Sequence, residues 1–298
     1  MQQGNSIWLK IGIAVAVFCC FMFIYKLLEQ PAPYTNTIGK LTNNYVRVNR
    51  TDSSYIKEVN QPYSVFVETT AYNWDARYYK AIKDSMYSGI DTVGMYRYAF
   101  YPFFPMVWKV SHANGHGIVL LNFLFFALAI FILTQVFLKN SASQLFYFTT
   151  SLILPTAVIY FIPYTEATFI LTFSLAVIGL VKKKYWLYYI AMVCFSMTRP
   201  AALILIVAFL AVNTINLFYH RKIWHFIKES VLATLPIFTA WGIVILIEYQ
   251  YSGSWNIYNQ ACNLWPKTSD LGAPLYDWSI EGFGMTTFAI CRTHLNLY

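Results

Sequence analysis

Charged side chains are scarce in this chain. Only 11% of its 298 residues are Asp, Glu, Lys or Arg, whereas 58% are hydrophobic and 19% are aromatic. Soluble domains normally carry about twice that charged fraction, so the composition excludes a water-soluble globule, a disordered chain and a soluble coiled coil. Several apolar runs are long enough to cross a bilayer, which indicates a membrane protein with several spans.

Cysteines are also few and show no metal-ligand spacing. Cys19, Cys20 and Cys194 lie in apolar runs, where a thiol behaves as a small hydrophobe. Cys262 and Cys291 are the two that a disulfide would join, although nothing in the sequence requires it. The chain lacks internal repeats, low-complexity segments and any glycine-rich phosphate loop, which disfavours a nucleotide-sugar enzyme and a transporter built from repeated halves.

Seven apolar segments are candidates for membrane spans. The first has no small-residue cleavage site after it, so it predicts an uncleaved helix rather than a signal peptide. A segment of about 20 residues suits a simple crossing, and the short one at residues 185–197 predicts a tilted helix or a partial crossing. The segments are Ile7–Leu28, Ile118–Leu138, Gln144–Ile162, Thr165–Val181, Tyr185–Met197, Ala201–Phe218 and Val231–Tyr249.

The predicted spans place each charged residue on one side of the membrane. With a cytoplasmic N-terminus, eight of the 21 Lys and Arg residues and one of the 13 acids, Glu229, lie inside, so that the net charge of +8 divides into +7 inside and +1 outside. This is the positive-inside distribution. The basic character therefore reports orientation in the membrane, and no nucleic-acid partner is needed to explain it. The inner cations are Lys10, Lys139, Lys182, Lys183, Lys184, Arg221, Lys222 and Lys228.

We therefore predict an all-α polytopic membrane protein, with a transmembrane domain over residues 1–249 and an outward-facing tail over residues 250–298. A long loop over about residues 29–117 and two turns near residues 163–166 and 198–200 also face outward. Chemistry is expected on this face because the inner loops are too short to form a site. Aromatic and acidic residues of the tail suggest a lid: Trp255, Trp265, Asp270, Asp277 and Trp278.

Within the outer loop, residues 73–86 predict an amphipathic helix with Asn73 as its N-cap. Its apolar face, which includes Tyr79, is expected to lie in the membrane interface. Asp75 falls on the same face one turn earlier. An acid in the first turn stabilises a helix, but an acid directed along the apolar face equally suggests a buried or substrate-facing role.

The segment Tyr101-Pro-Phe-Phe-Pro105-Met-Val-Trp108 follows. Its two prolines predict an interrupted helix, and its aromatic rings suit an interfacial anchor better than direct chemistry. His112 and His116 stand four residues apart, but the glycines between and after them predict a loop rather than a metal-binding helix face.

Two further charges stand at predicted outer helix ends. Glu166 follows Thr165 at a helix start, where Thr caps and Glu favours the helix dipole. Arg199 precedes Pro200 at another start, where a cation opposes the dipole and needs an anion. The anion is either Glu166 or Glu248, or a phosphate held by the guanidinium and the helix end together. We favour the phosphate because intramembrane charges are usually functional.

Four motifs in order resemble one known family. They are Trp74-Asp75-x-x-x-Tyr79, Tyr101-Pro-Phe-Phe-Pro105, Pro155 with Pro163-Tyr-Thr-Glu166, and Ser196-Met-Thr-Arg-Pro200. Together they cover roughly residues 72–210 and resemble the second mannosyltransferase of GPI-anchor assembly (the phosphatidylinositol-glycan class V family), most closely its bacterial relatives. Members of that family continue with further spans, whereas here the last apolar stretch, Gly282–Ile290, is too short to cross.

This resemblance implies the multi-span GT-C glycosyltransferase fold, with a sugar, mannose, donated from a polyprenyl (dolichol-type) phosphate. It implies Asp75 and Glu166 as catalytic residues, Asp75 as the catalytic carboxylate, with Arg199 at the donor phosphate in the same outer cavity. Trp74, Tyr79, Tyr101, Pro102 and Tyr164 would line the cavity.

The expected function is thus inverting sugar transfer to a lipid or glycan acceptor on the non-cytoplasmic face. The membrane would be a bacterial inner membrane, or the endoplasmic reticulum membrane of a eukaryote. A transporter or lipid-phosphate flippase, and an inactive truncated relative, are the alternatives. A divalent cation is compatible with the acids, but no two stand at ligand spacing, so we assign no metal residue and no cofactor.

Overall fold

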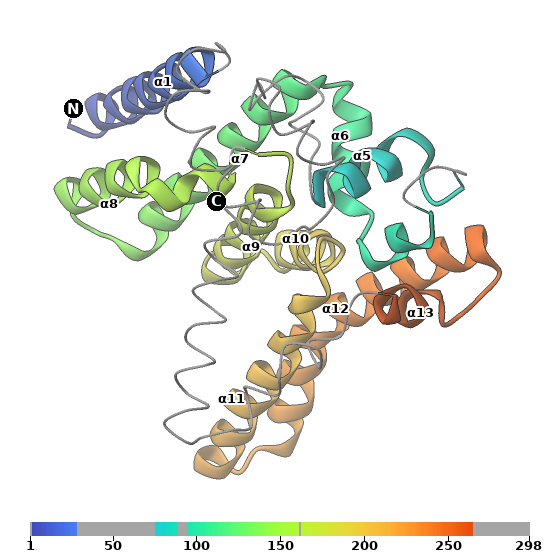
Figure 1. Ribbon diagram of the computed structural model, residues 1–298. Helices are drawn as coiled ribbons and strands as arrows, with labels where there is room; N and C mark the ends of the chain where they lie inside the picture. The colour runs from blue at the N-terminus through green and yellow to red at the C-terminus, as the bar shows by residue number, and fades with distance from the viewer. Residues whose placement is uncertain (1, 29–74, 89–93, 161, 265–298) are drawn as a thin grey trace, which may run out of the picture. The chain divides into compact units, whose positions relative to one another are not determined.

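The computed structural model describes residues 2–28, 75–88, 94–160 and 162–264, and every regular element in these ranges is a helix (Figure 1). The contacts divide the chain into two units, residues 1–21 with 71–261 and residues 22–70 with 262–298. The contacts discussed below lie within the first unit. Its elements are α1 (Gln2–Leu28, of which residues up to Phe21 belong here), α5 (Asp75–Ser85), η3 (Gly94–Ala99), α6 (Phe103–Ser111), α7 (Gly115–Phe137), α8 (Ser141–Ile153), η4 (Pro155–Tyr160), α9 (Glu166–Val181), α10 (Tyr185–Ser196), η5 (Pro200–Leu203), α11 (Ile204–His220), α12 (Ile223–Ser252) and α13 (Ile257–Asn263, of which residues up to Ala261 belong here).

The prediction of an all-α membrane protein is confirmed for the described residues. Three segments there are long and apolar enough to cross a membrane: Gly115–Phe137, Pro200–Tyr219 and Ile223–Ser252. Ile7–Phe23, α9 and α10 are apolar but shorter. The count of seven spans therefore stays a prediction.

The expected span at residues 144–162 is broken. Helix α8 ends at Ile153, and the 3-10 helix η4 replaces its second half. Leu154, which precedes Pro155, is extended at φ −54° and ψ 134°. A residue before proline is driven out of the helical region by the proline ring, so an apolar composition alone could not keep this stretch helical.

Helices α9 and α10 form a tight hairpin that carries the site residues at its open end. The turn at its closed end contains Lys183 with φ +54°. Gly179 lies so close to α10 that an added Cβ would stand 2.6 Å from the backbone nitrogen of Tyr188. Only glycine permits this approach without a shift of backbone. The opposite end of the hairpin brings Glu166, the first residue of α9, beside Arg199, which follows α10.

Two tyrosine hydroxyls join α10 to α12 at a proline. Tyr188 donates to the carbonyl oxygen of Ala233 at 2.8 Å, and the hydroxyl of Tyr189 hydrogen-bonds that of Thr239 at 2.7 Å. Pro236 lies between these two positions in α12 and has no N–H to offer the preceding turn. Tyr188 thus bonds the carbonyl oxygen next to that of Leu232, the one that Pro236 leaves without a helical donor.

The outer-loop helix α5 buries its apolar face in protein. Ala76 and Ile82 are fully buried and Tyr79 is nearly so, and α5 packs against α6 and η3. The face that we predicted to meet the membrane interface is therefore covered by the chain's own side chains. The buried guanidinium of Arg97 binds the carbonyl oxygen of Met86 and the hydroxyl of Ser85, and so satisfies the end of α5.

The prediction that two prolines prevent a regular helix over residues 101–108 is wrong. Helix α6 starts at Phe103 with Pro102 as its N-cap, and Pro105 lies in the first turn. First-turn N–H groups have no intrahelical partner, so a proline there costs no hydrogen bond. The aromatic side chains of this segment are buried rather than left as an interfacial anchor, because Phe104 and Trp108 pack with Tyr79 and Ile118.

Candidate functional site

Thr165 lies at the centre of a polar cluster. Its side chain is fully buried, and its hydroxyl accepts a hydrogen bond from Nε of Arg199 at 2.5 Å. The Tyr79 hydroxyl on α5 lies near Thr165, whose side chain opposes the rise of the Tyr79 pKa. Thr165 is the N-cap of α9 by position, yet its side chain does not cap the helix. The predicted capping role is therefore wrong, because the hydroxyl is bound to Arg199 instead.

Arg199 and Glu166 form an ion pair across the open end of the α9–α10 hairpin. Nη2 of Arg199 donates to Oε1 of Glu166, and the two side chains are 34% and 17% exposed. Of the anions considered for Arg199, the structure shows Glu166. In the described part of the chain, Nη1 of Arg199 makes no hydrogen bond, so this edge of the guanidinium remains a free donor.

The other oxygen of Glu166, Oε2, is buried and has no hydrogen-bond partner among the described residues. A buried acceptor without a partner costs about 1–3 kcal/mol. Such groups in native proteins are associated with strain, with a catalytic role, or with a water or ion that completes the bonding. Oε2 therefore marks a position where a donor from outside the chain fits.

Asp75 begins α5 beside the same pair. Its carboxyl group is half-buried and makes no hydrogen bond or ion pair with any described residue. Burial raises its pKa above the usual value, and the positive charges of Arg199 and Arg77 oppose this rise. Asp75 also acts electrostatically on Glu166, so the two acids and Arg199 lie in one electrostatic neighbourhood. A partly desolvated carboxylate without a partner is a suitable proton acceptor.

Two tyrosines lie near both acids and remain neutral. Burial raises the pKa of Tyr79 to about 12, against the opposing effects of Thr165 and Arg199. Burial, with the charges of Asp75 and Glu166, raises the pKa of Tyr164 above its ordinary range. The hydroxyl of Tyr164 also accepts a hydrogen bond from the backbone N–H of Asp75. Both phenols thus stay protonated at neutral pH and fix the start of α5 against the turn at residue 164.

Asn122 holds this turn and was missed by the sequence analysis. It is fully buried in the middle of α7. Its amide nitrogen donates to the carbonyl oxygens of Ile162, at 2.5 Å, and of Tyr164, at 3.3 Å. A lone Asn inside an otherwise apolar span was the available signal, since a buried amide needs partners.

The remaining predicted residues divide into three groups. Tyr101 and Pro102 are buried, and Tyr101 packs with Met197, Ala240 and Val244 beside the turn that carries Arg199. Trp255 is 63% exposed and stacks on Tyr249, with ring centroids 4.0 Å apart. The others lie outside the described residues: Asn73, Trp74, Trp265, Asp270, Asp277, Trp278 and Cys291.

No metal site forms within the described ranges, where no three His, Cys, Asp or Glu residues gather at ligand distance. His112 ends α6 in the left-handed region at φ +51°, and both it and His116 are exposed. Glu248, the other partner considered for Arg199, is buried on α12 near Tyr87 and Tyr98.

Comparison with known proteins finds no family model, no curated protein and no solved structure that matches this chain.

Proposed function

We propose that this protein is a membrane-embedded glycosyltransferase that transfers a sugar, mannose, from a polyprenyl-phosphate donor to a lipid or glycan acceptor on the non-cytoplasmic face. The observation that carries the proposal is the gathering of Asp75, Glu166 and Arg199 around Thr165, from three separate segments. Each of the three has an unused donor or acceptor. The resemblance of the four sequence motifs to the second mannosyltransferase of GPI-anchor assembly supports the same assignment.

The transfer would be a single displacement at the anomeric carbon. The acceptor hydroxyl forms the new C–O bond and gives its proton to Asp75, while the bond from the sugar to the phosphate oxygen breaks. Polyprenyl phosphate leaves with the electron pair. Asp75 fits the base because no other residue occupies its carboxyl group in the described part of the chain.

Arg199 and Glu166 would stabilise the charges that develop. The free Nη1 edge of Arg199 would bind the leaving phosphate, as a guanidinium does in a site of low polarity. Oε2 of Glu166 would face the positively charged sugar carbon or accept a sugar hydroxyl. The ion pair holds both groups in place before substrate binds, which lowers the cost of orienting them.

The test is transfer of radiolabelled mannose from a polyprenyl-phosphate donor by purified protein. Asp75→Asn should lower transfer by at least about 100-fold, the usual contribution of a general base. Asp84→Asn is the matched control, because Asp84 lies on the same helix but is exposed and pairs with Lys80 and Lys83. It should leave transfer unchanged.

Transfer at the wild-type rate by Asp75→Asn would remove Asp75 from the mechanism. Absence of product from the folded wild-type protein with several acceptors would count against sugar transfer. Movement of labelled donor across proteoliposomes without a covalent product would instead favour the transporter or flippase.

A further inference from the structure

A groove of about 430 Å³ runs between α1 and α7. This volume lies within the range of ligand pockets, roughly 300–1,000 Å³. Hydrocarbon side chains form nearly all of the lining, with Ala14, Val15 and Phe18 on α1 and Leu120, Leu124 and Leu128 on α7. The groove therefore suits a hydrocarbon chain rather than a polar solute.

Lys10 closes one end of the groove. Its Nζ donates to Oε1 of Gln144 at 3.1 Å and lies 5.3 Å from the centre of the Phe131 ring. Only 2% of the residue is exposed. Helices α1, α7 and α8 contain no Asp or Glu, and Lys10 makes no ion pair with any described residue. The ammonium is thus held by neutral groups alone, an arrangement that favours an added anion.

The Lys10 end is the inner end in the orientation predicted from the charge distribution. Gln144 also donates to the carbonyl oxygen of Leu138, just before the α7–α8 turn with Lys139. The other end lies near Phe18 and Phe123, whose ring centroids are 5.0 Å apart. Along α7, residues 120–131 correspond to about 17 Å, a length that suits one acyl chain.

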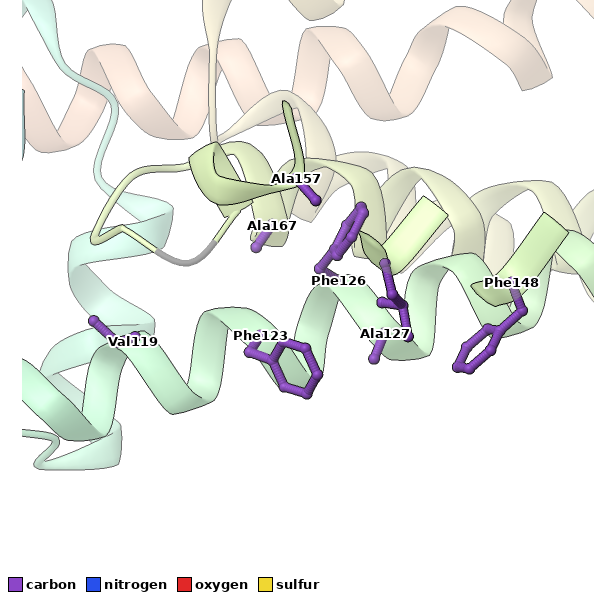
Figure 2. Packing of buried hydrophobic residues seen from close by; sticks show 8 residues of the cluster. Val119, Phe123, Phe126, Ala127, Phe148, Ala157 and Ala167 are labelled. Atoms are coloured by element: carbon purple, nitrogen blue, oxygen red, sulfur yellow. The ribbon is translucent and has the colours of Figure 1, made fainter. Parts of the chain in front are cut away.

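The charged end of the groove and the polar cluster lie at different levels along α7. Lys10 lies beside Phe131, whereas the turn before Glu166 is held by Asn122, nine residues earlier, or about 13 Å along the helix. Figure 2 shows Phe126, between these two levels, directed toward Ala157 and Ala167. Phe126 stacks on Tyr160, which is close enough to Glu166 and Arg199 to be affected by their charges. An anion at Lys10 therefore does not occupy the place proposed for the donor phosphate.

We propose that this groove binds one acyl chain of an anionic phospholipid of the inner leaflet, with the lipid phosphate on Lys10. Charge complementarity selects the headgroup, because the ammonium at the inner end has only neutral partners. The apolar lining selects the chain. Basic pockets between membrane helices on the cytoplasmic side are known to hold anionic headgroups. The proposal does not depend on the glycosyltransferase activity.

The test measures lipid retained by the purified full chain in native mass spectrometry, with phosphatidylglycerol and phosphatidylcholine of the same acyl chains. We expect wild type and Lys10→Arg to retain phosphatidylglycerol preferentially. Lys10→Met should bind it roughly fivefold more weakly, which corresponds to about 1 kcal/mol for one basic residue. Lys182→Gln, which removes an exposed inner charge, should have no effect.

A second variant keeps the charge and fills the groove. Ala14→Phe places a ring in the lining and should reduce phosphatidylglycerol retention while the melting temperature without lipid stays near that of wild type. Equal retention of phosphatidylcholine, or retention unchanged in both Lys10→Met and Ala14→Phe, would overturn the proposal. Displacement of phosphatidylglycerol by polyprenyl phosphate at equal concentration would also overturn it, since the groove would then hold a prenyl chain.

Discussion

The ion pair of Arg199 and Glu166 allows the strength of the site to be measured directly. The pair joins the start of α9 to the end of α10, and its side chains are 34% and 17% exposed. Exposed pairs contribute about 0–1 kcal/mol, whereas removal of one partner from a fully buried pair costs about 3–5 kcal/mol. A partly buried pair lies between, so Arg199→Met and Glu166→Gln should each lower the free energy of unfolding by about 2 kcal/mol.

The double variant separates the pair from its surroundings. It should be destabilised by less than the two single variants together, with a coupling energy of about 1–2 kcal/mol. The assay is denaturant unfolding in detergent micelles, followed by tryptophan fluorescence. The same cycle on Lys80 and Asp84, whose side chains are 40% and 42% exposed, is the control and should give about 0.3–0.5 kcal/mol.

A coupling energy below about 0.5 kcal/mol for Arg199 and Glu166, equal to the exposed control, would refute the reasoning. The two side chains would then be close without stabilising each other. The ion pair could not be said to hold Arg199 and Glu166 in position for a substrate.

Three further predictions concern the supports of the site. Arg77→Gln removes one of the positive charges that oppose the rise of the Asp75 pKa. Because a base must be ionised to act, the acid limb of the pH profile of kcat/KM should move to higher pH; an unchanged limb, or one at lower pH, would contradict this. Gly179→Ala should destabilise the protein by about 1–3 kcal/mol through overpacking. Gly242→Ala, where an added Cβ meets nothing within 4 Å, should instead stabilise α12 by up to about 1 kcal/mol, so melting temperatures that change in the same direction in both variants would contradict the hairpin geometry. Asn122→Ala removes the side-chain donor from the carbonyl oxygens of Ile162 and Tyr164, of which only that of Ile162 keeps a backbone donor. It should cost about 1–3 kcal/mol and lower kcat/KM as well; wild-type unfolding and transfer would show that the turn at residues 162–164 is held without it.

Apolar periodicity and charge were enough to predict the helices that pack simply. The predicted segments at residues 118–138, 165–181 and 185–197 lie within a few residues of α7, α9 and α10. Helix α12 begins at Ile223, eight residues before the predicted start, because a helix continues through Lys228 and Glu229 although an apolar run does not. Hydropathy indicates which residues can contact lipid, but the bounds of a helix depend on its backbone hydrogen bonds.

The site was predictable in its charges but not in its bonding. Glu166 and Arg199 stood out as charges at the ends of apolar segments, and Asp75 as an acid on the apolar face of an amphipathic helix. The choice of Glu166 over Glu248 as partner of Arg199 depends on which helix ends meet in the fold, which linear sequence does not express. The role of Asn122 likewise requires contacts 40 and 42 residues along the chain.

The lengths of the helices also bear on how a bilayer would fit around this protein. Helices α9 and α10 have 16 and 12 residues and α12 has 30, which correspond to about 24, 18 and 45 Å. The hydrocarbon core is about 30 Å thick, so α9 and α10 match only a locally thinned bilayer, whereas α12 must tilt or project from it. Arg199 and Glu166 at the open end of the hairpin would then lie below the general level of the headgroups. The lipid-borne donor proposed above would be carried to that depth by the membrane, so that bilayer thickness would itself control access to the site.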